Sequence, residues 1–175
     1  MRALLIMLCL MGQAYAQNLY GIQEKSIEGK EFNTDSLKGK VVMIVNIASQ
    51  CGYTTQLAAL ETLNQKYKEK GFILLGVPTN DFNGQTPESD EGMKEFCSKK
   101  YNVTFPLLNK RTVQGKEKRP LYKFLTEKTP KKFQAEIGWN FEKFLVNKKG
   151  EVVGRFRPSL APDDKSITEM IEKNL

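Results

Sequence analysis

The sequence predicts a single α/β domain with a central mixed sheet flanked by helices. Apolar, β-branched runs typical of buried strands alternate with segments of helical periodicity, and a hairpin signal lies near the C-terminus. The chain of 175 residues suits one domain with a substantial core. Because no internal repeat, linker or low-complexity segment interrupts it, we expect one folded unit over residues 17–175.

The first half of the chain predicts a hairpin followed by a strand–helix–strand unit. Glu28-Gly29 suits the hairpin turn, and the run Val41–Ala48 is apolar and β-branched, as a strand covered on both faces would be. Leucines then recur at helical spacing until Gly71 ends the helix. A right-handed crossover makes the flanking strands parallel. In chain order we expect strands at 22–26, 30–32 and 41–47, a helix at 55–70 and a strand at 72–77.

Capping and turn residues place the elements of the second half. Ser89 suits the N-cap of a helix, Pro106 a short edge strand, and Pro120 the first position of another helix. The segment Asn147–Gly150 predicts a hairpin turn. In chain order we expect a helix from 90 through 97, an edge strand at 105–108, a helix at 120–127, strands at 139–146 and 151–156, and a helix at 166–174. This order (βαβ, helix, ββα) is that of the thioredoxin fold with an N-terminal hairpin added.

Cys51 lies where the strand at 41–47 ends and the helix at 55–70 opens. A thiol so placed lies beside unpaired backbone N–H groups and the positive end of a helix dipole, and both favour the reactive thiolate. The alternative is an inert, buried cysteine, because free cysteine is among the most buried residue types. Position alone does not choose between these two interpretations.

Three ordered segments resemble the glutathione peroxidase family in its cysteine-containing form. They are Asn46–Thr54, which includes Cys51, then Pro78–Pro87 and Gly138–Val146. The resemblance covers nearly all of residues 18–175. It implies the thioredoxin fold and an enzyme that reduces hydrogen peroxide or organic hydroperoxides, including those of lipids, in response to oxidative stress.

The same resemblance implies that Cys51 is catalytic and that Gln85, Trp139 and Asn140 support it. Two amides and an indole N–H are neutral donors, which hold a thiolate without forming a tight ion pair. Each supporting residue also has a structural alternative: a core aromatic for Trp139, a turn residue for Asn140 and a solvated loop side chain for Gln85. No metal or bound cofactor is expected, and an external thiol reductant is the co-substrate.

Cys97 is the resolving cysteine that the resemblance implies, because the stretch around it resembles the one that carries this residue in thioredoxin-dependent members. A sulfenic acid on Cys51 would condense with it to a disulfide. Bridging requires the helix to open locally, so we predict that this helix is marginally stable. Lys99-Lys100 is expected to lower the pKa of Cys97 modestly. The alternative is an inert thiol buried beside Met93.

The chain departs from the family pattern at three places. Thr79 stands where many members carry Cys, which leaves fewer candidate thiols. Asp81 stands where many carry Gln, and its charge would raise the pKa of Cys51 if the two lay close. The segment between Asn109 and Trp139 lacks the longer insertion of tetrameric members, so we expect a monomer.

Residues 1–16 predict a secretory signal peptide. Arg2 precedes an apolar run at 3–11 that is too short to span a bilayer, and Ala14-Tyr15-Ala16 supplies the small residues that signal peptidases recognise. We expect cleavage after Ala16 and export to the periplasm or the cell exterior. Cleavage removes Cys9 and leaves two cysteines, for which a permanent structural disulfide is the alternative to a reversible one.

Composition excludes several functions. The chain has no histidine, so a Ser-His-Asp triad, a His-ligated haem and the usual zinc sites are excluded. Its net charge of +7 comes from dispersed lysines without interleaved aromatic residues, so no nucleic-acid partner is expected. Membrane contact is expected to be at most peripheral. The expected partners are a peroxide and a reductant, either a thioredoxin-like protein or glutathione.

Two other functions fit the same scaffold. A thiol–disulfide oxidoreductase is the nearest enzyme, but Thr54 stands where the second cysteine of its Cys-x-x-Cys would be. A non-catalytic secreted binding protein or redox sensor is the other alternative, and the presence of Gln85, Trp139 and Asn140 argues against it.

Overall fold

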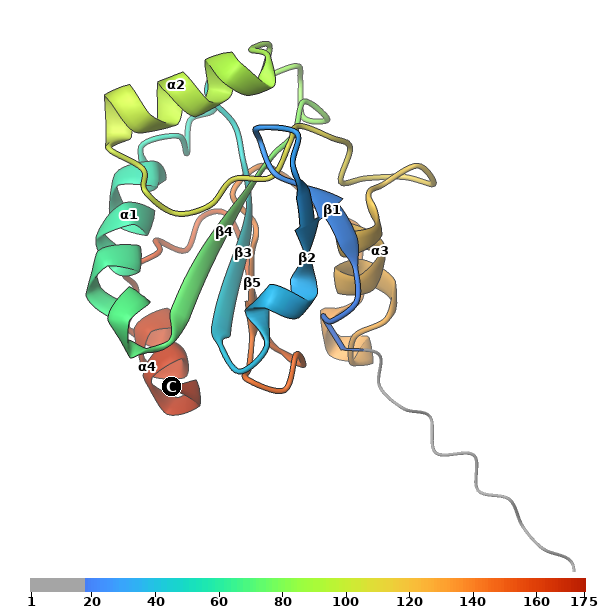
Figure 1. The fold of residues 1–175 in the computed structure, drawn as a ribbon, viewed down its shortest axis with the longest axis vertical. Helices are drawn as coiled ribbons and strands as arrows, with labels where there is room; N and C mark the ends of the chain where they lie inside the picture. The colour runs from blue at the N-terminus through green and yellow to red at the C-terminus, as the bar shows by residue number, and fades with distance from the viewer. Residues whose placement is uncertain (1–17) are drawn as a thin grey trace, which may run out of the picture.

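The computed structural model describes residues 18–175 as a four-stranded sheet with helices on both faces and a small N-terminal hairpin beside it (Figure 1). The predicted signal peptide and its cleavage after Ala16 lie outside the described residues. None of the helices formed by residues 18–175 is both long and apolar enough to cross a membrane.

The chain order of elements agrees closely with the sequence prediction. The strands are β1 (Gln23–Lys25), β2 (Glu31–Asn33), β3 (Val41–Ile47), β4 (Phe72–Pro78), β5 (Lys143–Val146) and β6 (Val152–Phe156), and the helices are α1 (Gln56–Tyr67), α2 (Asp90–Tyr101), α3 (Pro120–Glu127) and α4 (Lys165–Asn174). Short 3₁₀ helices cover Thr34–Leu37, Lys68–Lys70 and Lys131–Phe133. The main sheet has the order β4-β3-β5-β6, with β3 parallel to β4 and the other pairs antiparallel. The predicted parallel βαβ unit and the mixed sheet are confirmed.

Two cores lie on opposite faces of the sheet. Alternate residues of β3, beginning with Val41, pack with α1, α4 and part of α2. The residues between them, beginning with Val42, pack with α3 and the segments beside it. Every residue of β3 is buried, which explains why its sequence is apolar throughout except at Asn46, rather than alternating between apolar and polar residues.

The strand predicted at 139–146 begins later than expected, at Lys143. Residues before it form a turn in which Phe141 has a left-handed φ of 66°. The side chain of Asn46, in β3, holds this turn: its Nδ2 donates to the Trp139 carbonyl at 3.0 Å and its Oδ1 accepts from the Glu142 N–H at 3.1 Å. The turn therefore replaces the first residues of the predicted strand.

The edge strand predicted at 105–108 is reduced to two isolated bridges, between Leu107 and Gly76 of β4 and between Leu108 and Ser26. Gly76 lets this segment approach closely. A Cβ at that position would lie 2.5 Å from Leu107 Cδ2 and 3.0 Å from the Phe105 ring. The missing side chain thus lets residues 105–108 cover the outer edge of β4.

Candidate active site

Three segments meet at the ends of the central strands, beneath α2 at the top of Figure 1. They are the turn that follows β3, the loop that follows β4 and the turn that precedes β5. Because β3 and β4 are parallel and β5 runs the other way, all three open at the same edge of the sheet. The main chain joins the first two, since Gln50 N–H donates to the Gln85 carbonyl at 3.0 Å.

Cys51 lies in the turn before α1 and is partly exposed as a free thiol. The main-chain N–H of Tyr53 lies 3.5 Å from its Sγ. Thr54 fixes the turn, because its Oγ1 accepts from the Cys51 N–H and donates to the Ala48 carbonyl, both at 2.9 Å. The helix itself begins at Gln56, within a residue of the predicted start, so Cys51 lies in the turn that precedes it. The turn supplies the backbone donor at the sulfur.

Gln85 and Asn140 are in direct contact. Asn140 is fully buried, and its Nδ2 donates to Gln85 Oε1 at 3.0 Å. This bond fixes which end of the Gln85 amide faces Asn140 and leaves Gln85 Nε2 as a donor for another group. Asn140 Oδ1 is buried without a hydrogen-bond partner among residues 18–175. Two of the three supporting side chains predicted from the sequence are therefore brought together.

Trp139 is anchored at the same place by its main chain and its ring. Its carbonyl accepts from Asn46, and its ring lies 5.6 Å from the ring of Phe82, centroid to centroid. Within the described residues its indole N–H makes no hydrogen bond to Cys51. Asn46 is a positioning residue that the sequence reading missed, although a lone amide inside an apolar strand was a visible signal.

Cys97 has a different environment from Cys51. It is buried in α2 and burial raises the pKa of its thiol to about 12, with a further contribution from the negative charge of Glu88. Lys99 pairs with Glu95, and Lys100 lies over the rings of Phe96 and Tyr101. The expectation that these lysines lower the pKa of Cys97 is therefore wrong, because their charges are directed elsewhere and desolvation dominates.

Glu88 connects the surroundings of the two cysteines. Its carboxylate accepts a hydrogen bond from Ser49 Oγ and another, at 3.4 Å, from Gln50 Nε2, so it contacts both residues that precede Cys51. The same charge acts on the Cys97 thiol. Nothing in the local sequence around Glu88 indicates this contact, because its partners lie almost forty positions earlier in the chain.

Residues 18–175 contain no group of three or more cysteine or carboxylate side chains placed to hold a metal ion. The chemistry that this part of the chain offers is that of two thiols, two amides, an indole and nearby main-chain donors. Such a set can stabilise a thiolate and an oxygen anion without a metal.

Comparisons with known proteins agree with this arrangement. The family model described as Glutathione peroxidase matches residues 19–126. A glutathione peroxidase-like peroxiredoxin of Schizosaccharomyces pombe is 47% identical over 146 residues, which cover 83% of this chain and 92% of that protein. The crystal structure of T. cruzi GPX1 has a TM-score of 0.69 at 31% identity, covering 90% of this chain and 94% of that one. A thioredoxin family thiol:disulfide interchange protein from Chlorobium tepidum shares the fold, with a TM-score of 0.65, 18% identity and coverage of 92% and 99%.

Proposed function

The chain belongs to the glutathione peroxidase family and is a thiol peroxidase, and from this premise we propose that Cys51 is the sulfur that attacks the peroxide. One observation carries the assignment: the turn that presents Cys51 is bonded to the segment of Gln85, whose side chain is in turn held by Asn140. A partly exposed sulfur, a backbone N–H directed at it and a fixed amide therefore lie at one edge of the sheet.

In the proposed reaction the Cys51 thiolate attacks one oxygen of the peroxide. A sulfur–oxygen bond forms, the O–O bond breaks, and the other oxygen leaves as hydroxide or alkoxide and takes up a proton. The product is a sulfenic acid. The Gln85 Nε2 group, the Trp139 indole N–H and the Tyr53 main-chain N–H are the donors proposed to stabilise the charge on sulfur and oxygen.

Recycling is proposed to use Cys97. Its thiol condenses with the sulfenic acid, releases water and forms a Cys51–Cys97 disulfide, which an external thiol then reduces. Disulfide partners need Cα atoms about 5.5 Å apart, and Cys97 is buried in α2, so the helix must open during this step. A thioredoxin-like protein is the proposed reductant, with glutathione as the alternative.

We further propose that the protein is an exported monomer that protects the periplasm or the cell exterior against hydrogen peroxide and organic or lipid hydroperoxides. The proposal rests on residues 1–16, which have the sequence of a signal peptide, and on the short segment between Asn109 and Trp139. Mass spectrometry of the exported protein tests it: a mature chain beginning at Gln17 is expected, and retention of residues 4–10 would contradict it.

The catalytic assignment is tested by the rate at which peroxide oxidises the reduced protein in a single turnover. Gln85→Leu is expected to slow this reaction by about ten- to hundredfold, because a donor to the developing charge is lost. Gln23→Leu, an exposed amide in β1, is the matched control and should leave the rate unchanged. An unchanged rate in Gln85→Leu would remove Gln85 from the site. Insulin-disulfide reduction, measured in parallel, tests the oxidoreductase alternative.

A further inference from the structure

We propose that Asp81 is a positioning residue for the active site, which fixes the Trp139–Asn140 turn through the loop 112–115. The inference rests on the function proposed above. Asp81 lies four positions before Gln85, and its carboxylate was expected to act, if at all, by its charge on Cys51. In the structure this carboxylate instead accepts hydrogen bonds from the loop 112–115.

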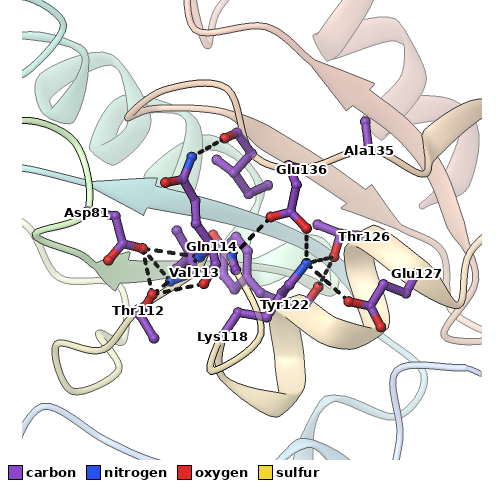
Figure 2. A network of polar contacts seen from close by, with 12 residues as sticks. Asp81, Thr112, Val113, Gln114, Lys118, Tyr122, Thr126, Glu127, Ala135 and Glu136 are labelled. Carbon is purple, nitrogen blue, oxygen red and sulfur yellow. Dashed lines mark hydrogen bonds and ion pairs between the residues drawn. The ribbon is translucent and has the colours of Figure 1, made fainter.

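One carboxylate oxygen of Asp81 accepts hydrogen bonds from residues 112–114 of this loop (Figure 2). Its Oδ2 accepts from Thr112 Oγ1 at 3.0 Å, from the Val113 N–H at 2.6 Å and from the Gln114 N–H at 3.2 Å. Carboxylates that accept several main-chain N–H groups are strong anchors, because the charge replaces the water that these donors would otherwise need. The conformation of residues 112–114 therefore depends on this side chain.

The far side of the loop holds the chain just before Trp139. Gln114 Nε2 donates to the Ile137 carbonyl at 2.6 Å, and the Gly115 N–H donates to Glu136 Oε2 at 3.3 Å. The buried ammonium of Lys118 contacts the other oxygen of Glu136. Figure 2 shows the contacts of Asp81 with residues 112–114 and those of Lys118 with Glu136, Thr126 and Glu127 as parts of one network.

The Asp81 network and the contact between the Phe82 and Trp139 rings both hold the Trp139–Asn140 turn. Phe82, the residue after Asp81, lies against the Trp139 ring. The segment of Asp81 and Gln85 is thus joined to the Trp139–Asn140 turn at three points: the Phe82 ring, the Gln85–Asn140 hydrogen bond and the 112–115 loop. Of these three connections, the one through the 112–115 loop contains the Asp81 carboxylate, so it is the connection that a substitution of this carboxylate is expected to break.

The test uses the single tryptophan of the chain as a reporter of the turn. Asp81→Ala is expected to shift the Trp139 emission spectrum and to slow single-turnover oxidation by peroxide by about ten- to hundredfold, because small displacements of positioned groups cost that much. Asp81→Asn keeps one acceptor oxygen and is expected to restore most of both signals. Gln114→Leu should reproduce the effects of Asp81→Ala, and the double variant should be no worse than the stronger single variant, since both break one pathway.

Asp35→Asn is the matched control. This carboxylate also accepts a main-chain N–H, from Gly21 at 3.1 Å, but it lies in the 3₁₀ helix after β2, and neither signal should change. Faster oxidation in both Asp81 variants, with unchanged emission, would show that the charge acts directly and would overturn the proposal. A lower melting temperature with wild-type emission and rate would overturn it too. If the wild-type protein itself does not react with peroxide, the proposed function fails, while the emission spectra still decide whether Asp81 positions the turn.

Discussion

The turn that carries Cys51 and the helix that carries Cys97 differ in almost every physical respect. Cys51 is partly exposed and receives a main-chain N–H, in a turn fixed by Thr54 and by the Gln85 segment. Cys97 is buried, and burial raises the pKa of its thiol to about 12. The difference agrees with the proposed roles, in which Cys51 attacks the peroxide and Cys97 reacts only after α2 has opened.

The two regions also differ in how strongly the rest of the fold holds them. The Cys51 turn is held by hydrogen bonds to neighbouring segments at the ends of the central strands. Helix α2 contributes only Met93 and Cys97 to the buried core, and its remaining side chains are exposed or partly buried. Segments with few buried apolar contacts open at lower free energy than the rest of a fold. This agrees with the predicted marginal stability of α2, which stays a prediction.

The largest expected effect comes from removing the reactive sulfur. Cys51→Ser should reduce the rate of peroxide consumption by at least about a thousandfold, because a hydroxyl is a far weaker nucleophile than a thiolate. Peroxide consumption under excess reductant measures this. If Cys51→Ser retained most of the activity, Cys51 could not be the sulfur that attacks the peroxide, and the proposed difference in reactivity between the two cysteines would be wrong.

The second effect is the protection of Cys97 in the reduced protein. At pH values well below 9.0, the ordinary pKa of the thiol, Cys97 is protonated in both the folded and the unfolded state. Between about pH 9 and 12 the unfolded state loses this proton first, so Cys97 should contribute a fall of up to about 1.4 kcal/mol per pH unit to the free energy of unfolding. Lys143, whose pKa burial lowers to about 8, contributes a rise between that value and its ordinary value of 10.5. Folded protein at pH 8 should alkylate at Cys97 at least about a hundredfold more slowly than unfolded protein, with opening of α2 setting the limit.

Mass spectrometry after timed iodoacetamide labelling gives the alkylation rate of each cysteine, and denaturant titration at several pH values gives the slope. Cys97→Ser is the control, because subtracting its curve from that of the wild-type protein separates the contribution of Cys97 from those of Lys143 and Tyr122, whose pKa values burial also shifts. Equal labelling of Cys51 and Cys97 in the folded protein would contradict the difference between the two regions.

A third effect separates attack from recycling. Cys97→Ser should leave the first oxidation of Cys51 unchanged, while turnover driven by thioredoxin falls by at least about tenfold because no internal disulfide forms. The sulfenic acid should then persist long enough to be trapped by dimedone. Full thioredoxin-driven turnover in this variant would mean that the external thiol resolves Cys51 directly.

The smallest effect concerns the helix alone. Ser89 Oγ accepts from the Gly92 N–H at 3.2 Å and caps α2. Ser89→Ala should destabilise the helix by about 1 kcal/mol and speed disulfide formation by up to about fivefold. Asp164→Ala removes the corresponding cap of α4 and should leave that rate unchanged. A slower rate in Ser89→Ala would indicate that the intact helix presents Cys97.

Local sequence signals predicted most of the fold. The β-branched run in β3 and Pro120 at the start of α3 placed these two elements at their observed bounds, and the leucine spacing placed the start of α1 within a residue. The helix predicted to end at residue 70 ends as an α-helix at Tyr67 and continues as the 3₁₀ helix Lys68–Lys70. The start of β5 could not be found in this way. It depends on Asn46, which lies 93 positions before Trp139, and a hydrogen bond over that separation leaves no local pattern.

The residues of the candidate site likewise fall into those that the sequence could identify and those whose contacts it could not reveal. The position of Cys51 between strand and helix made it a candidate, and the family resemblance implied its catalytic role together with those of Gln85, Trp139 and Asn140. The contacts of Glu88 with the Cys51 turn and of Asp81 with the 112–115 loop depend on how distant loops meet. Only coordinates show these, because a carboxylate in a loop has the same sequence signature whether it is solvated or bound.

The absence of a side chain at Gly76 has a consequence for association between molecules. Because residues 105–108 fit against it, the main-chain N–H and carbonyl of Gly76 bond to the Pro106 carbonyl and the Leu108 N–H and are not free to pair with another chain. Exposed edge strands are templates for aggregation. At the opposite edge of the sheet, Arg155 donates to the carbonyls of Phe133 and Ala135 and keeps a loop beside β6. A single methyl group at position 76 would displace the first cover, so Gly76→Ala is expected to expose the outer edge of β4 to other chains.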